Sequence, residues 1–339
     1  MIIAAAKKPS MMISSNGVAL EPFSTTTETS FVRAVSLPIL ESSQNEDGGW
    51  AFRAGLASRV EPTCWALLAL LQTEDVEEQS ERISRGLAFI RTAQLADGSW
   101  PASPDQKTGA SASSLACWTL LAAKDTSNAA AAGLRWICSD WPIDSVLWRR
   151  IINGLVRKNK KIVQHNDAYR GWGWTPRTAS WVEPTAFALI ALSQCPAELL
   201  PTGAKQRQKL GKALLLDRMC PGGGWNCGNP KAYGVAGEPL VVPTVWALIA
   251  LRDERDRPEV KLSLEWLKSN IREIRSGPSL ALARLCLETF GETQEIGENE
   301  IRIAFERNAF LENVCASAWA CLAFLGNRRW LNVTSSENC

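Results

Sequence analysis

The sequence predicts an all-α protein, an α6/α6 toroid in which an inner and an outer ring of helices are concentric. A glycine-rich turn that ends on tryptophan occurs four times, and apolar residues recur at helical spacing without sustained strand alternation. Such recurrence is typical of repeat architectures. The four turns are Asp47-Gly48-Gly49-Trp50, Asp97-Gly98-Ser99-Trp100, Gly171-Trp172-Gly173-Trp174 and Gly222-Gly223-Gly224-Trp225.

Two kinds of helix alternate along the chain. One kind has a polar face and would form the outer ring, at 31–44, 82–94, 129–138, 205–219, 260–271 and 298–308. The other is apolar nearly all round and would form the enclosed inner ring, at 62–71, 111–122, 184–192, 243–251, 278–290 and 314–325. Because Ala, Cys, Ser and Leu dominate the second kind, we expect the inner ring to surround an apolar cavity.

A single toroid domain is predicted over residues 28–330, with tails at 1–27 (disordered) and 331–339. The repeat period breaks once, at an insertion over residues 139–170. A helix is expected there at 143–156, and six basic residues crowd the stretch from Arg149 to Lys161. Residues 143–161 either make a peripheral membrane contact or pack on the barrel with a solvated basic end.

The composition excludes several classes of function. A net charge of +2 gives no general attraction to nucleic acid. The ten cysteines are scattered without a C-x-x-C pair, which favours reduced thiols and a cytoplasmic location. No uninterrupted apolar run reaches the roughly 20 residues of a membrane span.

The glycine–tryptophan turns are interpreted as structural staples. Glycine permits the positive φ of a tight turn, and the preceding Asp can accept from nearby backbone N–H groups. The tryptophan then supplies a large apolar plate and one N–H donor, which suits it to wedging an outer helix against the next inner one.

Two carboxylates mark the starts of inner helices. Glu61 and Glu183 each precede a Pro-Thr pair, and proline suits the first helical turn. Because inner helices of a toroid run in one direction, both carboxylates would lie at one mouth of the barrel. Trp65 and Phe187 follow four residues later, and Trp246 is equivalent in a third copy. These rings either face the lumen, where they could stabilise a carbocation, or form ordinary core.

The chain resembles the squalene/hopene cyclase and prenyltransferase β-subunit superfamily. The segment Arg85-Gly86-x-x-Phe89-Ile90-x-x-x-Gln94-x-x-x-Gly98-x-Trp100 is similar to its repeat at every marked position. The Pro-Thr-x-x-Ala-Leu-x-Ala-Leu helix is similar as well, and together the resemblance covers about residues 30–325. It implies a terpenoid cyclase-like toroid that binds an isoprenoid or similar apolar molecule in its lumen.

The resemblance also implies a reaction, protonation-initiated (class II) cyclisation of a polyprenyl or triterpene substrate. Class II cyclases use the middle Asp of a D-x-D-D-T motif as the proton donor. Here Glu183 is the first candidate for that acid and Glu61 the second, although Pro follows each and no first Asp precedes them. A helix N-terminus favours the ionised carboxylate, so helix capping is the alternative interpretation of both residues.

No metal or cofactor is expected. The superfamily's prenyltransferases hold Zn²⁺, but the single histidine, His165, lies in the insertion, and Asp217, Cys220 and Cys227 match no dependable zinc spacing. Mg²⁺ would be needed only if the substrate carried a diphosphate. The acids of residues 253–256 are interpreted as part of a solvated loop.

Two other classes of function stay open. The toroid could be non-catalytic and bind a lipid or a protein partner. Alternatively, it could be a glycan-active (α/α)6 enzyme in which Glu61 and Glu183 form a carboxylate pair, and such pairs lie about 5 to 9.5 Å apart.

Overall fold

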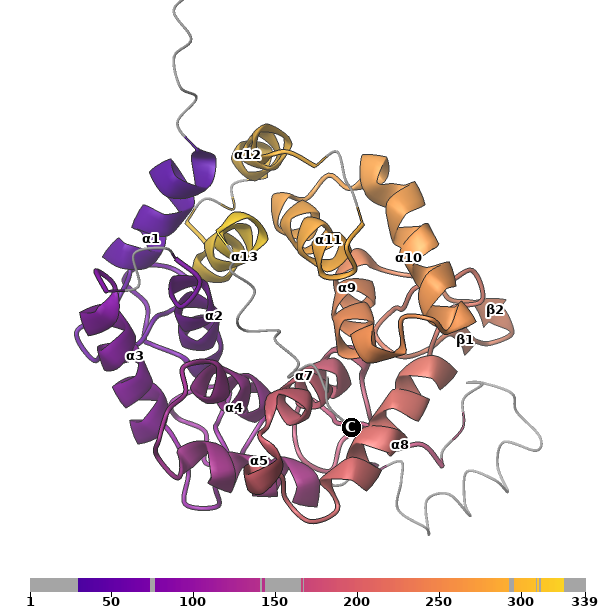
Figure 1. The fold of residues 1–339 in the computed structure, drawn as a ribbon, viewed down its shortest axis with the longest axis horizontal. Helices are drawn as coiled ribbons and strands as arrows, with labels where there is room; N and C mark the ends of the chain where they lie inside the picture. Colours follow the sequence, from indigo (N-terminus) through magenta and orange to yellow (C-terminus); the bar gives the residue numbers. More distant parts are fainter. Residues whose placement is uncertain are drawn as a thin grey trace, which may run out of the picture.

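The structure is a computed structural model that describes residues 30–73, 77–140, 142–143, 166, 168–292, 296–308, 310 and 312–325. Within these residues the helices form two concentric rings (Figure 1). The predicted all-α toroid is therefore confirmed. The expected tails at 1–27 and 331–339 and nearly all of the insertion, with its helix at 143–156, lie outside the described residues.

The inner ring closes on itself. Each of its helices packs on the next, and the last one packs on the first. Almost every residue of these helices is buried, because each helix has neighbours on both sides and an outer helix behind it. They are α2 (Val60–Leu70), α4 (Ala112–Ala122), α7 (Val182–Gln194), α9 (Val241–Ala250), α11 (Gly277–Thr289) and α13 (Val314–Phe324). Among the described residues, no helix combines the length and the apolar composition that crossing a membrane requires.

Each outer helix packs against one inner helix. The outer ring consists of α1 (Leu37–Ser42), α3 (Ser80–Thr92), α5 (Ala129–Ser139), α8 (Ala204–Asp217), α10 (Pro258–Asn270) and α12 (Glu298–Arg307). The first outer segment differs from the single helix expected at 31–44, because it begins as the π-helical turn η1 (Val32–Ser36).

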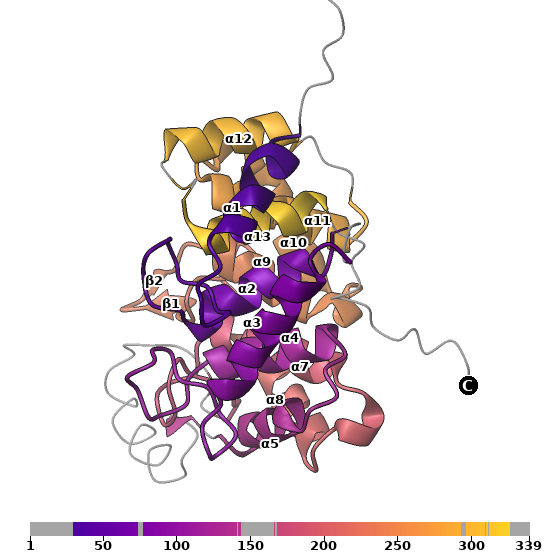
Figure 2. The ribbon, with the colours of Figure 1, turned by 90° about the vertical axis from the view of Figure 1, so that its left-hand side faces the viewer.

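Short elements fill the connections. The 3₁₀ turns are η3 (Ala197–Leu199), η4 (Arg252–Glu254) and η5 (Ile271–Glu273), and a small hairpin pairs β1 (Lys231–Ala232) with β2 (Val235–Ala236). In the side view, this hairpin and the long connections that lead into α2 and α4 project on the same side of the ring (Figure 2). That side is the mouth at which the inner helices begin.

The tryptophan turns are staples in the structure too. The indole N–H of Trp50 donates to the carbonyl of Leu40, ten residues upstream in α1, at 2.7 Å. Trp100 and Trp225 repeat this bond at the same separation, to Ile90 and Leu215. Trp172 makes it across the insertion, to Ile137 of α5 at 2.8 Å. The staple therefore joins a turn to the preceding outer helix whatever length of chain lies between them.

Three of the four staples also need glycine on the next outer helix, and the fourth, at Trp225, faces α10, which contains no glycine. A Cβ built on Gly86 would lie 2.8 Å from the ring of Trp50, and one on Gly133 would lie 2.5 Å from the ring of Trp100. Gly211 stands in the same relation to Trp172. The tryptophan thus lies in a slot that only a residue without a side chain leaves open.

The threonine of the Glu-Pro-Thr motif joins the glycine–tryptophan turn to the inner helix by hydrogen bonds. The Thr63 hydroxyl accepts from the backbone N–H of Trp50 at 2.8 Å and donates to the carbonyl of Arg59. Thr185 and Thr244 hold Trp172 and Trp225 in the same way, and Ser113 replaces them for Trp100. This part of the motif is therefore structural.

Substituting Thr63 by Val is expected to lower the free energy of unfolding by about 1–3 kcal/mol, because the buried N–H of Trp50 would lose its acceptor. Thr63→Ser is the matched control, since the second copy of the turn uses a serine for this bond. Urea denaturation measures both variants. Equal stability of Thr63→Val and the parent protein would contradict this structural role of the Thr63 hydroxyl.

Candidate functional site

Two carboxylates lie at the mouth where the inner helices begin. Glu61 and Glu183 occupy the first turns of α2 and α7, which are separated in the ring by α4. Burial raises the pKa of Glu61. The pKa of Glu183 is raised to about 7, chiefly by burial and additionally by the negative charge of Glu61. Both side chains are therefore half-buried, and Glu183 lies close enough to Glu61 to be affected by its charge.

Neither glutamate caps its helix. The N-cap positions belong to Arg59 and Trp181, and no side-chain cap bond is made there. Within the described part of the chain, neither carboxylate takes part in a hydrogen bond. The helix N-terminus favours the ionised form, but the raised pKa values mean that desolvation outweighs it. The structure gives no support to the capping interpretation.

Aromatic rings lie one helical turn farther along the inner helices than the carboxylates, and so deeper in the ring. Trp65 and Trp246 stack with ring centroids 5.0 Å apart, and Phe187 meets Trp246 edge-on at 5.4 Å and Trp65 at 5.9 Å. These side chains come from α2, α7 and α9, so they point toward the ring axis and meet there. The three residues predicted from the sequence are thus brought together.

Two members of this aromatic cluster were missed by the sequence analysis. Trp118 of α4 and Trp319 of α13 each meet Trp65 edge-on at 5.8 Å. Counting from the N-cap residue could have found Trp319, because it stands six residues after Asn313, as Trp65 stands six after Arg59. Trp118 lies on α4 outside this register, and no comparable signal marks it.

The aromatic cluster fills the centre of the ring. We expected an apolar cavity lined by small side chains, but rings from five inner helices are in mutual contact at this level. The difference arises because one large side chain from each helix is long enough to reach the axis. A recess of about 530 Å³ lies elsewhere, between the connections that lead into α2 and α4, where Arg59 and Phe89 line it.

The cluster contains two unsatisfied donors. The indole Nε1 atoms of Trp65 and Trp319 are buried, and within the described residues neither has a hydrogen-bond partner. Buried donors of this kind call for an explanation, since leaving one unpaired costs about 1–3 kcal/mol. Both donors are buried, so an acceptor could reach either of them only if the surrounding side chains moved apart.

The rim of the mouth carries several exposed apolar side chains, together with charged ones such as Arg53, Lys107 and Glu238. Tyr233 and Val235 of the hairpin are 80% and 70% exposed, and Leu240, the N-cap of α9, is 50% exposed. Trp174 and Trp181 are exposed on the connection into α7. Most of the exposed large apolar side chains of the described residues thus lie on the connections that enter inner helices. Such a patch is typical of a surface that receives an apolar ligand or partner.

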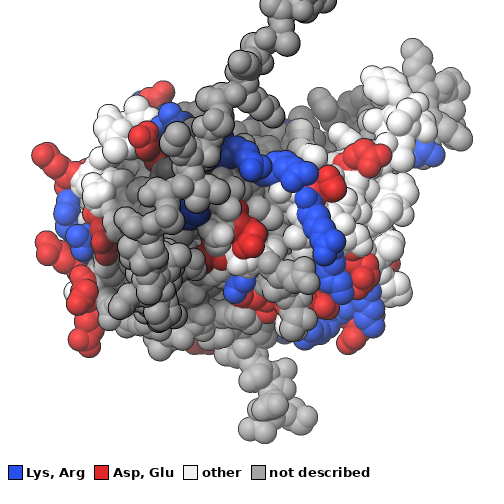
Figure 3. Space-filling model, turned by 90° about the horizontal axis from the view of Figure 1, so that it is seen from above, with Lys and Arg blue, Asp and Glu red and all other residues white. Residues whose placement is uncertain are grey.

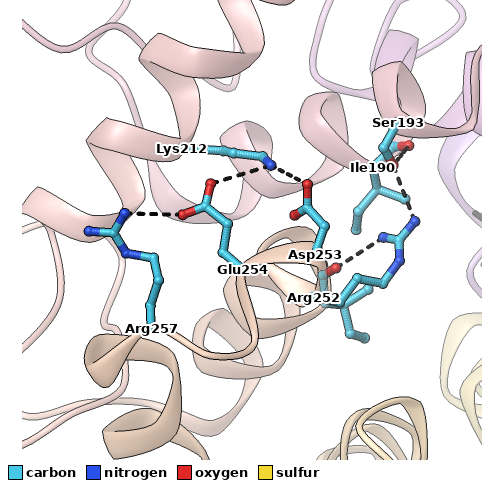
Figure 4. A network of polar contacts seen from close by, with 8 residues as sticks. Ile190, Ser193, Lys212, Arg252, Asp253, Glu254 and Arg257 are labelled. Atoms are coloured by element: carbon cyan, nitrogen blue, oxygen red, sulfur yellow. Dashed lines mark hydrogen bonds and ion pairs between the residues drawn. The ribbon is translucent and has the colours of Figure 1, made fainter. Parts of the chain in front are cut away.

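The other acids singled out in the sequence form no site. Lys212 pairs with Asp253 and, at 3.4 Å, with Glu254, which also pairs with Arg257 at 3.3 Å (Figure 4). This network joins η4 to α8 at the opposite end of the inner helices. Asp217 pairs with the adjacent Arg218.

The described residues bring together no group of three His, Cys, Asp or Glu side chains that could hold a metal ion. Asp217, Cys220 and Cys227, whose spacing matches no dependable zinc pattern, are among the residues that form no such group. Cys227 instead lies near Glu183, whose charge contributes to raising the pKa of the thiol after the larger effect of burial. His165 lies outside the described residues.

Comparisons with known proteins bear on the fold. No protein-family model matches the sequence, and no curated protein matches it. The structure is similar to that of a protein from Actinoplanes (15% identity, 89% of this chain and 98% of that one, TM-score 0.57). It is also similar to the type II terpene cyclase MstE from Scytonema, with 14% identity over 83% of this chain and 78% of that one and a TM-score of 0.52. An α-amylase from Clostridium perfringens is similar as well, with 10% identity over 89% of this chain and 99% of that one and a TM-score of 0.55. At these identities the likeness shows the fold alone, and the chain has the helical-toroid fold of these proteins.

Proposed function

We propose that this chain is an acid catalyst of the terpenoid-cyclase type that protonates an oxygen-bearing isoprenoid at the mouth of the ring. The observation that carries the proposal is the half-buried pair of Glu61 and Glu183 at the mouth, in which Glu183 has a pKa of about 7. A general acid is most effective when its pKa lies near the working pH. Apolar surroundings raise the pKa of a carboxylic acid in the same way in other enzymes.

Glu183 is the proton donor, and the negative charge of Glu61 helps to keep Glu183 protonated by raising its pKa. In the proposed reaction Glu183 transfers its proton to an epoxide oxygen, and the adjacent carbon–oxygen bond breaks. The π electrons of a nearby double bond then form the new carbon–carbon bond, and the last cation returns a proton to a carboxylate of the pair. Trp65 and Trp246 stack on each other and are buried, so they form an apolar floor beneath the site.

The filled centre of the ring limits how a substrate binds. A long chain has no open path along the axis through the aromatic cluster, so the substrate is proposed to lie across the mouth. There the exposed apolar side chains of the rim would hold its hydrocarbon part, and its oxygen would lie at the carboxyl group of Glu183. An oxygen is the better target for a carboxylic acid with this pKa, because an unactivated double bond is a far weaker base. This reaction needs no cofactor.

The proposal is tested by incubating the purified protein with oxidosqualene, squalene and geranylgeranyl diphosphate and analysing extracts by mass spectrometry. A cyclised product from the epoxide is expected, and Glu81→Gln should leave its formation unchanged, since Glu81 is an exposed first-turn glutamate of an outer helix. Absence of product from all three compounds would contradict the cyclase proposal. Recovery of bound lipid in that case would favour a non-catalytic lipid-binding toroid.

A second candidate function is glycan hydrolysis. Two carboxylates above an aromatic floor could also act on a sugar, since glycosidases use paired carboxylates and one of the similar structures is an α-amylase. Release of reducing ends from starch or β-1,4-glucan, lost in Glu183→Gln, would establish it. The exposed apolar side chains of the rim favour the isoprenoid.

The pKa of Glu183 also predicts a pH dependence of stability. In the folded protein this pKa is about 7, above the ordinary value of 4.5, so the folded state holds the proton more tightly than the unfolded chain. Stability from this group is complete below pH 4.5 and is lost as the pH rises through 7. Between pH 5 and 8 the loss should be on the order of 2 kcal/mol. Urea denaturation should show a smaller loss in Glu183→Gln but not in Glu81→Gln, and parallel profiles would contradict the assignment.

A further inference from the structure

A groove on the outside of the ring lies between η5 and α12. Its volume is about 300 Å³, which is at the lower end of the range for small-molecule sites. It shares no lining residue with the carboxylates or the aromatic cluster of the mouth. Leu280 and Ile296, which are 8% and 3% exposed, belong to its apolar lining.

One face of α12 forms the first wall. Glu300, Ile303, Ala304 and Arg307 line the groove and follow the i, i+3, i+4, i+7 spacing of a single helix face. Ile303 is 41% exposed there, although the helix has a buried apolar face of its own. An exposed isoleucine that faces a groove is an apolar surface without a partner in the described structure.

The second wall is formed by η5 and the residues after it. Here two isoleucines and two arginines alternate, namely Ile271, Arg272, Ile274 and Arg275. The two walls are tied together, because the side-chain amide of Asn308 donates both to the carbonyl of Arg275 at 2.8 Å and to that of Ala304 at 2.7 Å. The groove is therefore held in shape before any ligand binds.

The charge at the groove is positive. Arg272, Arg275 and Arg307 line it, and Glu300 is the one carboxylate among its described lining residues. Arg275 approaches Glu273 only at 4.0 Å, and both side chains are more than two-thirds exposed, so this ion pair contributes little. The view onto the edge of the ring that carries α10 and α12 shows a band of Lys and Arg side chains (Figure 3). Guanidinium groups beside an aliphatic floor suit a ligand with one apolar and one anionic end.

We propose that this groove binds a single aliphatic chain that ends in a carboxylate or a phosphate monoester. The isoleucines and Leu280 would cover the chain, and Arg275 and Arg307, which come from opposite walls, would bind the anionic end. The site is independent of the mouth of the ring and of the reaction proposed there.

Calorimetric titration of the full-length protein with decanoate, decyl phosphate, decanol and inorganic phosphate tests the proposal. Saturable binding of decanoate or decyl phosphate is expected, at least tenfold tighter than that of decanol or inorganic phosphate, and the tighter of the two identifies the anionic group. The double substitution Arg275→Gln with Arg307→Gln should weaken it at least tenfold. Arg302→Gln is the matched control, since Arg302 lies on α12 but pairs with Glu306 and does not line the groove.

Several results would overturn this site. They are the absence of saturable binding by both anionic amphiphiles, equal affinity for decanol or for inorganic phosphate, and an equal loss of affinity in Arg302→Gln. Thermal unfolding of each variant shows that it is folded. Glu183→Gln should bind as the parent protein does, so failure of the cyclase proposal would leave this one standing, and the reverse also holds.

Discussion

Glu183→Gln is expected to lower turnover of an epoxide substrate by roughly 10²- to 10⁴-fold, the usual contribution of a general acid. Glutamine keeps the size and polarity of the side chain but has no acidic proton to transfer. Because the substitution also removes a carboxylate that is costly to ionise in this environment, the variant should be folded and at least as stable as the parent protein at pH 8. The measurement is kcat with oxidosqualene, together with urea denaturation at the same pH.

Glu61→Gln separates the two roles within the pair. Loss of the Glu61 charge should lower the pKa of Glu183, because that charge contributes to raising it, so the pH–rate profile should move to lower pH while a product still forms. Unchanged turnover in Glu183→Gln would show that the acid assignment is wrong, even if the protein is a cyclase.

Trp100→Ala is expected to lower the free energy of unfolding by about 3–5 kcal/mol, as for other large-to-small substitutions of buried aromatic residues. The side chain is fully buried, its indole N–H bonds to Ile90 of the preceding outer helix, and its ring occupies the slot left by Gly133 of the next one. The substitution therefore removes contacts with two outer helices at once. Guanidinium chloride denaturation followed by circular dichroism measures the loss.

Trp174→Ala is the control for this substitution. Trp174 belongs to the third glycine–tryptophan turn, but its side chain is 40% exposed, so its loss should cost much less. Similar destabilisation of the two variants would mean that tryptophan content, and not the staple geometry, determines stability.

Most of the fold could be predicted because its determinants are local. The alternation of helices follows from apolar spacing, and the staples follow from turn residues such as Gly98 and Trp100 that act within one repeat. One further step predicted that Glu61 and Glu183 lie at the same mouth of the ring, because the inner helices all run in one direction.

The properties of the site depend on distances across the ring and were harder to predict. Whether Trp65 lines a cavity or meets Trp246 depends on the radius of the inner ring, which apolar spacing does not report. The protonation of Glu183 depends on how much water reaches the mouth, and the helix N-terminus alone pointed to the opposite outcome. The arginines of the outer groove come from two elements that only the folded ring brings together.

The closure of the ring has a consequence for how the protein is made. Helix α13, the last described helix, packs between α11 and α2, so one flank of each of these helices stays uncovered until α13 is synthesised. Both are apolar helices, and exposed surfaces of this kind make incomplete chains prone to aggregate. The nascent protein therefore carries an open apolar edge from the synthesis of α2 until that of α13, and a chain that ends before α13 would keep that edge permanently.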